Sequence, residues 1–233
     1  MKLSANTPSE LLKKIGKIDI TVPPRSEGRT TEHSETYSIC YLLSTLAETD
    51  FIQWPLIIQK RERPDFYLKV GNTEVGIEIT ESVPQNEAAK EALRDSGNGP
   101  DVYFISSVSP GEKKKNHKKL KKEICSNLPG DGWWGDQPEK EWAEAMLSTI
   151  NKKTEKYLNP TYKKYSNNWL LIYDNWPLPH FDHKLSSQKL IKLLEHNSVF
   201  KLWDNIFIHS RKKIHIFSAS LINSYETLNI WKY

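Results

Sequence analysis

Apolar residues recur along the chain with two different spacings, which predicts a protein that mixes helices with strands. Spacings of three and four residues predict a helix over 34–48 and a second one over 139–158. The continuous apolar run 169–173 has the length of a strand that is covered on both faces. This alternation predicts an α/β (α+β) fold, a mixed β-sheet flanked by helices. The other expected core elements are a helix over 187–196 and strands over 54–59, 205–209 and 213–217.

A hairpin around Gly71-Asn72 has a register that follows from its turn. A two-residue turn, in which glycine can adopt a positive φ, pairs residues that are equidistant from it. Phe66 then lies opposite Ile77, and Asp65 lies opposite Glu78. The remaining pairs are Leu68 with Val75, Val70 with Thr73, Lys69 with Glu74, and Tyr67 with Gly76.

Asp65 and Glu78 form the one pair that this hairpin does not favour by itself. Two carboxylates opposite each other on paired strands have Cβ atoms roughly 5 Å apart and repel each other. A shared divalent cation would remove the repulsion, and Mg²⁺ (or Mn²⁺) accepts one or two carboxylates and leaves its other positions to water and phosphate oxygens. A solvated acidic patch, or a carboxyl group with a raised pKa, would also account for the pair.

The residues around this pair resemble a known motif. Pro64-Asp65, followed by a strand, a turn, a strand and the segment 76–80, is similar to the metal-binding hairpin of the PD-(D/E)XK nuclease superfamily. The resemblance implies a restriction-endonuclease-like core of a helix, a three-stranded meander, a helix and a strand. It also implies a metal-dependent phosphodiesterase in which Asp65, Glu78 and the backbone carbonyl of Ile79 hold Mg²⁺.

A third carboxylate lies in the first predicted core helix. Glu35 precedes Ile39 by four residues and Leu42 by seven, so it shares their apolar stripe. Members of the superfamily often have a glutamate on this helix, which implies that Glu35 binds a second cation or its water. A glutamate near a helix N-terminus is also favoured by the helix dipole without any metal.

The chain departs from the motif two residues after Glu78, where the family has a lysine and this chain has Thr80. That lysine orients the attacking water or stabilises charge on the phosphate, and threonine carries no charge. Some members of the superfamily move the charge to the following core helix, where Lys153 lies on the apolar stripe. Lys153 is therefore the first candidate for the catalytic lysine, and Lys152 and Lys156 are the next candidates. Thr80 is a second group that could position the nucleophile. A lysine that extends from the stripe to water is the alternative.

Lysines are concentrated in one segment, between Glu112 and Glu123. Such a cluster can neutralise several phosphates and gives a salt-dependent affinity that is largely independent of sequence. A solvated helix would show the same pattern. The candidate nucleic-acid-binding residues are Lys113, Lys114, Lys115, Lys118, Lys119, Lys121 and Lys122.

The order of the segments suggests a helix and linker over 1–30 and a nuclease-like domain over 31–233, with 84–138 as an insertion. A capping box at Thr7 to Glu10 predicts that the first helix begins there and ends before Gly16. Within the insertion we expect a helix over 85–94, a strand over 102–107, the lysine-rich helix and an irregular segment over 130–136.

Composition adds three constraints. The net charge of +4 is too small to indicate nucleic acid by itself. Cys40 and Cys125 are too few for a disulfide framework and have no zinc spacing. No apolar run reaches the roughly 20 residues of a transmembrane helix, and the N-terminus has no signal-peptide pattern, so we expect a cytoplasmic protein with no membrane partner.

Three further groups have chemical potential. The segment 180–183, with two histidines and an aspartate, is a weak chelating motif, and a surface role is favoured for a loop of this kind. His209 and His215 lie on adjacent predicted strands, where they could face each other or serve as ordinary strand residues. Trp133 and Trp134 could stack on unpaired bases or, as we favour, anchor their loop to the core.

The sequence therefore predicts a metal-dependent endonuclease that acts on DNA, in restriction, phage defence or a mobile element. The main alternative is a nuclease-like fold without catalysis that binds nucleic acid or a protein partner within a complex. Thr80 favours this alternative, whereas the Asp65 and Glu78 pair opposes it. A third reading keeps the metal site and changes the substrate to RNA. Whether the chain forms a homodimer or joins an accessory protein subunit is left open.

Overall fold

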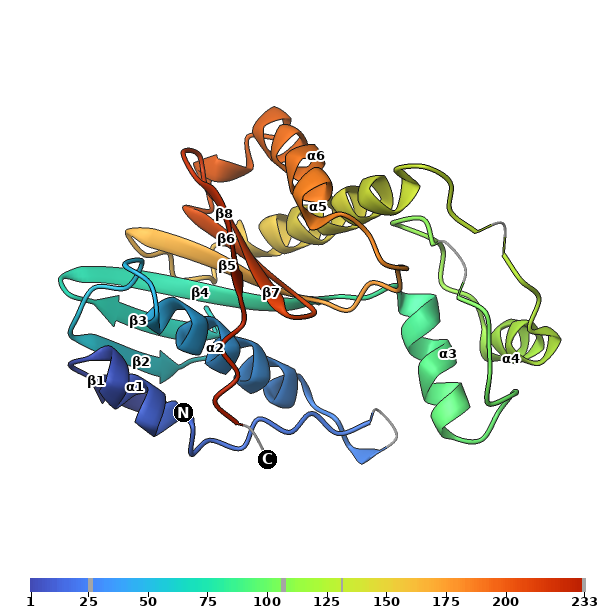
Figure 1. The fold of residues 1–233 in the computed structure, drawn as a ribbon, viewed down its shortest axis with the longest axis horizontal. Coiled ribbons are helices and arrows are strands. Elements are labelled where there is room, and N and C mark those ends of the chain that lie inside the picture. Colours follow the sequence, from blue (N-terminus) through green and yellow to red (C-terminus); the bar gives the residue numbers. More distant parts are fainter. Residues whose placement is uncertain (25–26, 106–107, 131, 232–233) are drawn as a thin grey trace.

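In the computed structural model, which describes residues 1–24, 27–105, 108–130 and 132–231, the strands form a single mixed sheet whose spatial order follows the sequence (Figure 1). The pairs β4–β5 and β5–β6 are parallel and all other neighbouring pairs are antiparallel. The eight strands among the described residues are β1 (Lys2–Ala5), β2 (Leu56–Lys60), β3 (Phe66–Val70), β4 (Thr73–Ser82), β5 (Asn167–Asp174), β6 (Asn205–Ser210), β7 (Lys213–Phe217) and β8 (Ile222–Glu226).

Helices cover both faces of this sheet. On one face, α1 (Pro8–Ile15) and α2 (Thr31–Ala47) share a core with residues such as Leu171 of β5. On the other face, α5 (Gln137–Tyr157) and α6 (His183–His196) pack against Leu170 and its neighbours. Because alternate residues of β5 enter the two cores, the apolar run predicted as a doubly covered strand is confirmed.

The hairpin strands belong to a three-stranded meander, with one long helix before it and another after the insertion. Helix α2 is followed by the meander β2–β3–β4, and helix α5 is followed by β5, which pairs in parallel with β4. The coarse prediction of a mixed α/β fold is therefore confirmed, with six α-helices in the described part of the chain. The core helices α2, α5 and α6 begin two to four residues earlier than the sequence indicated.

The hairpin register is confirmed from Val70↔Thr73 to Phe66↔Ile77. Gly71 has a φ of +57°, as the two-residue turn requires. Gly76 is needed for another reason, because a Cβ atom there would lie 2.7 Å from the Tyr165 ring. The Tyr165 ring also lies beside Tyr67, the hairpin partner of Gly76, with the two ring centroids 5.4 Å apart.

The insertion contributes α3 (Gln85–Asp95) and α4 (His117–Ser126). These two helices share a small apolar cluster of their own, which contains Leu93, Leu120 and Ile124. Figure 1 shows α3 and α4 at one end of the molecule, with α4 farther from the sheet than α3. The insertion is therefore a helical appendage whose packing is largely internal.

Several predicted elements differ from the structure. The strand expected over 102–107 is wrong over residues 102–105, which belong to no strand and carry exposed side chains, while Ser106 and Ser107 lie outside the described residues. The sheet gains β1 and β8, which the sequence did not indicate. Residues 25–26 of the expected linker and Asp131 of the expected irregular segment are also outside the described residues. Within the described ranges, no helix is both long and apolar enough to cross a membrane.

Candidate active site

Asp65 and Glu78 meet where the hairpin ladder ends. Glu78 lies within β4 and is 1% exposed, whereas Asp65 immediately precedes β3. Beyond the last paired residue of β3, the Asp65 Oδ2 atom accepts a hydrogen bond of 2.6 Å from the backbone N–H of Ile79. The Asp65 carboxylate therefore continues the ladder with its side chain, and this bond holds it beside Glu78.

Lys153 reaches both carboxylates from helix α5. Its Nζ atom lies 2.5 Å from Glu78 Oε2 and 3.7 Å from Asp65 Oδ2. The same amine donates a hydrogen bond of 3.0 Å to the backbone oxygen of Ile79. The structure thus brings together the two predicted acids, the predicted lysine and the predicted backbone carbonyl, although the lysine comes from a different element than in the family motif.

The electrostatics of this group are those of crowded, buried charges. Burial, followed by repulsion from Asp65, raises the pKa of Glu78 to about 7. Burial also raises the pKa of Asp65, against the opposing effect of Lys153. Burial alone would lower the pKa of Lys153, but the two carboxylates outweigh it and raise that pKa. One lysine therefore balances only part of the charge of two buried acids.

The donor set fits a hard divalent cation. Both carboxylate oxygens of Glu78 are buried and lack a hydrogen bond of good geometry, so that the close approach of Lys153 to Oε2 is their compensation. A Mg²⁺ or Mn²⁺ ion held by Asp65 and Glu78 would satisfy these oxygens and relieve their repulsion. The carbonyl oxygen of Ile79 has a second lone pair available beside the one that Lys153 uses.

Glu35 lies near this group without joining it. Glu35 lines a cavity of about 350 Å³ that Asp65, Thr80 and Lys153 also line. Burial, followed by the charge of Asp65, raises the pKa of Glu35, yet its ion pair is with Lys60, whose Nζ is 3.4 Å away. Throughout the described residues, no group of three or more histidine, cysteine, aspartate or glutamate side chains is placed to hold a metal. The role of Glu35 as a ligand to a second cation stays a prediction.

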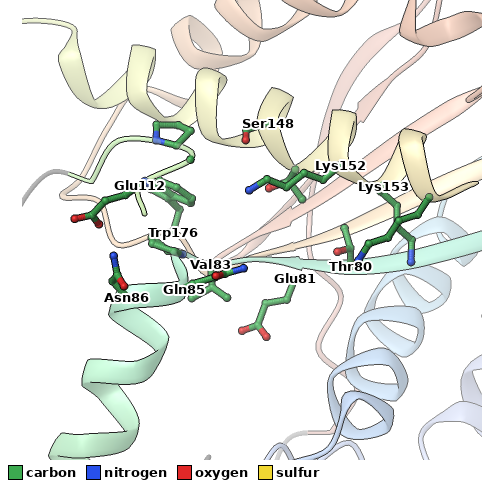
Figure 2. Close-up of a pocket in the computed structure, with 15 residues that line it drawn as sticks. Thr80, Glu81, Val83, Gln85, Asn86, Glu112, Ser148, Lys152, Lys153 and Trp176 are labelled. Atoms are coloured by element: carbon green, nitrogen blue, oxygen red, sulfur yellow. The ribbon is translucent and has the colours of Figure 1, made fainter. Parts of the chain in front are cut away.

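Thr80 lies at the junction of two cavities. It lines the cavity described above and a second one of about 360 Å³, which continues from the site toward the insertion. Glu81 and Lys153 also line both cavities. Figure 2 shows the second cavity, with Thr80 and Lys153 at one end of it. The candidate site is therefore the middle of a longer depression that extends in two directions.

Two basic residues of the site had no sequence signal. Arg29, in the segment before α2, donates hydrogen bonds to Glu81 Oε1 at 3.0 Å and to Ser34 Oγ at 3.1 Å, and it lines the first cavity. Lys60, at the end of β2, pairs with Glu35. Both lie where chain segments meet only after folding, so neither a periodic pattern nor a motif could have identified them.

The lysine cluster of the insertion is not brought to the carboxylates. Lys115 is engaged with Glu112 at 2.8 Å and with Glu123 at 3.1 Å. Its other members are exposed along α4 and the segment before it, and Figure 1 places α4 at the outer end of the insertion. Nucleic-acid binding by these lysines stays a prediction.

The histidine hypotheses are changed by the structure. His209 and His215 occupy neighbouring ladder positions, His209↔Ile214 and Ile208↔His215, and therefore point to opposite faces of the sheet. The rings of His209 and Tyr37 are stacked on the α2 face. On the other face, His215 Nε2 lies 3.2 Å from His183 Nδ1. The prediction that His209 and His215 could face each other is wrong.

The segment 180–183, which we expected to be a loop, ends in the first turn of a helix. His183 is the first residue of α6, and Asp182 is the N-cap, whose carboxylate accepts hydrogen bonds from the backbone N–H groups of Lys184 and Leu185. The aspartate therefore has a structural partner. The two loop tryptophans differ in their surroundings. Trp133 donates a hydrogen bond of 2.9 Å to Glu141 and packs against the core between the sheet and helices α5 and α6, whereas Trp134 is 76% exposed.

Comparisons of the chain with protein-family models, with curated proteins and with solved structures found no match. The group of Asp65, Glu78 and Lys153 is therefore the feature of the molecule that bears most directly on its function.

Proposed function

We propose that the protein is a metal-dependent endonuclease of the PD-(D/E)XK type, with a restriction-endonuclease-like core and with DNA as its expected substrate. The observation that carries the proposal is the position of the Lys153 amine, 2.5 Å from Glu78 and 3.7 Å from Asp65. A buried pair of acids with an adjacent lysine is the set of groups that metal-assisted phosphodiester hydrolysis uses. The order α2, β2–β3–β4, α5, β5 supports it further.

In this mechanism Asp65 and Glu78 would hold the Mg²⁺ ion, and the Ile79 carbonyl would be available as a further oxygen ligand. When bound, the ion would lower the pKa of the attacking water and offset charge on the phosphate. Lys153 supplies the charge that Thr80 lacks: its amine orients the nucleophile and stabilises negative charge on the phosphate. The Thr80 hydroxyl, at the junction of the two cavities, positions the water or a phosphate oxygen.

One observation favours a second candidate function. Lys153 and Glu78 already neutralise each other in close contact, and such a pair can stabilise a fold that binds nucleic acid, or a protein partner, without catalysis. In that case the site would need no metal. The two candidates differ in whether a cation matters, because only the nuclease would need the metal that Asp65 and Glu78 would share, whereas the contact of Lys153 with Glu78 and the hydrogen bond of Asp65 to Ile79 serve either function.

The test is cleavage of plasmid, linear duplex DNA, single-stranded DNA and RNA by purified protein, in Mg²⁺, in Mn²⁺ and in chelator. Wild type is compared with Asp65→Ala and Glu78→Ala. Glu62→Ala is the matched control, because Glu62 is an exposed acid in the same connection between β2 and β3. We expect metal-dependent cutting by wild type and Glu62→Ala and none by the two site variants. Absence of cutting on every substrate by folded wild type would favour the binding function.

A further inference from the structure

The second cavity, between α5 and the insertion, has two chemically different walls. Lys152 and Lys156 extend from α5 on one side. Val83, Pro84 and Trp176 provide apolar and aromatic surface on the other. Figure 2 shows Lys152 on one side of the cavity and Val83 and Trp176 on the other. Cationic groups facing an aromatic wall match the two halves of a nucleotide, its phosphate and its base.

The charges around this cavity favour an anion. Glu81 lines the cavity but is paired with Arg29 at 3.0 Å, and Glu112 is paired with Lys115 at 2.8 Å. Lys152 and Lys156 are exposed, and neither forms an ion pair with any described residue. The acids are therefore compensated, while two lysine charges remain available to phosphate groups.

The lysines are arranged along a path that leads to the proposed catalytic group. Lys152 and Lys156 are four residues apart on α5 and so lie on the same side of the helix, one turn apart. Lys153 and Thr80 line the same cavity. A strand whose scissile phosphate lies at the Asp65 and Glu78 site can thus continue past Lys152 and Lys156 with its next phosphates.

Trp176 is held in place before any ligand binds. Its indole Nε1 donates a hydrogen bond of 3.0 Å to Glu141 Oε1, and its backbone N–H donates to Asp174 Oδ1 at 3.1 Å. Asp174 is itself fixed by Trp142 Nε1 at 2.7 Å and by Ser210 Oγ at 2.6 Å. An aromatic ring that is already fixed loses little entropy when a base stacks on it.

The size of the cavity limits what it can accept. A volume of about 360 Å³ is that of a small-molecule site, so the cavity can enclose a single nucleotide but not a base pair of a duplex. We propose that this cavity binds an unpaired nucleotide adjacent to the scissile phosphate, so that the substrate is single-stranded nucleic acid or the single-stranded end of a duplex. This inference rests on the proposed function, because it takes the Asp65 and Glu78 group as the place where the strand is cut.

The test measures binding separately from cleavage. In an Asp65→Ala background with chelator, a fluorescent single strand of about eight nucleotides is titrated by anisotropy. Single-stranded DNA, single-stranded RNA and a blunt duplex of the same sequence are compared. The variants are Trp176→Ala, Trp176→Phe and the double variant Lys152→Gln/Lys156→Gln. Trp134→Ala, at an exposed tryptophan outside the cavity, and Lys192→Gln/Lys201→Gln, outside the cavity on α6 and the 3-10 turn after it, are the matched controls.

We expect tighter binding of a single strand than of the duplex. Trp176→Ala should weaken it about tenfold while Trp176→Phe retains most of the affinity. The double lysine variant should make the dependence of log Kobs on log salt concentration less steep by about 1.4. The controls should bind like the background protein, and comparison of DNA with RNA identifies the sugar.

Two results would overturn the inference. One is equal single-strand affinity in the cavity variants and the controls, and the other is preferred binding of the blunt duplex. Either can occur together with Asp65-dependent cutting of duplex DNA, in which case the proposed function stands and the nucleotide site does not. Conversely, cavity-dependent binding of single strands without cleavage by wild type would support the site and remove the nuclease.

Discussion

The Nζ atom of Lys153 on α5 lies 2.5 Å from Oε2 of Glu78 on β4, although the whole insertion separates the two elements in the sequence. In the family motif that the hairpin resembles, the lysine would occupy the position of Thr80, on the same strand as the glutamate. Lys153 and Thr80 line the same two cavities, and the proposed mechanism depends on the amine of Lys153 supplying the charge that Thr80 lacks.

The first prediction concerns the stability of this pair. Lys153→Met leaves Glu78 buried without a partner, and we expect the free energy of unfolding in chelator to fall by about 3 kcal/mol. Lys153→Met/Glu78→Leu removes both charges and should recover most of that loss, because the buried acid no longer needs compensation. Urea denaturation measures both variants. Equal stabilities of the single and double variants would contradict a buried ion pair.

The second prediction concerns the metal. A cation that binds only the folded protein stabilises it, by about 2.7 kcal/mol at 100 times its Kd. We expect Mg²⁺ or Mn²⁺ to raise the Tm of wild type and of Glu62→Ala, and to leave the Tm of Asp65→Ala unchanged. Thermal unfolding monitored by circular dichroism gives this result without any substrate. An equal rise in all three proteins would place the metal elsewhere.

The third prediction concerns acid pH. Burial lowers the pKa of His209 to about 4 and that of His215, again mainly through burial, to about 3. Both histidines titrate near pH 6.5 in the unfolded chain, so below that pH the unfolded state binds protons that the folded state does not. The stability linked to keeping these histidines neutral is complete well above pH 6.5 and is lost as the pH falls toward 4, by about 3 kcal/mol for each histidine.

Urea denaturation across this pH range measures the effect. His209→Phe and His215→Phe should each lose less stability between pH 6.5 and pH 4 than wild type, since each keeps a ring and removes one titration. His196→Gln, at an exposed position on α6, is the control and should follow the wild-type curve. Parallel curves for all four proteins would show that these histidines do not control the acid sensitivity.

Local patterns were sufficient to predict the centre of the fold. The hairpin register followed from a two-residue turn, and the β5 strand followed from an apolar run that enters both cores. The edges of the sheet could not be predicted, because β1 and β8 are short and mostly exposed and so have no strong apolar pattern. The run Val102 to Ile105 was wrongly predicted as a strand because its residues have strong strand propensity. In the structure it has no strand to pair with, and its side chains are exposed.

The site residues that could be predicted are those that belong to a local sequence pattern. Asp65 and Glu78 came from one turn, and Lys153 came from a helical stripe that identifies the inward face of α5. Arg29 and Trp176 belong to connections between elements, whose partners are determined by the packing of segments far apart in the chain. The sequence offers no physical rule that pairs such residues before the fold is known.

The most direct test of the central claim exchanges the position of the lysine. Single-turnover cleavage in Mg²⁺ is measured for wild type, Lys153→Ala, Thr80→Lys/Lys153→Ala and Asp65→Ala. If Lys153 supplies the charge that the family motif supplies two residues after Glu78, Lys153→Ala should lose about 100-fold or more in rate. Thr80→Lys/Lys153→Ala should then recover most of that loss, and Asp65→Ala should be inactive. Full activity of Lys153→Ala, or no cleavage by folded wild type, would contradict the claim.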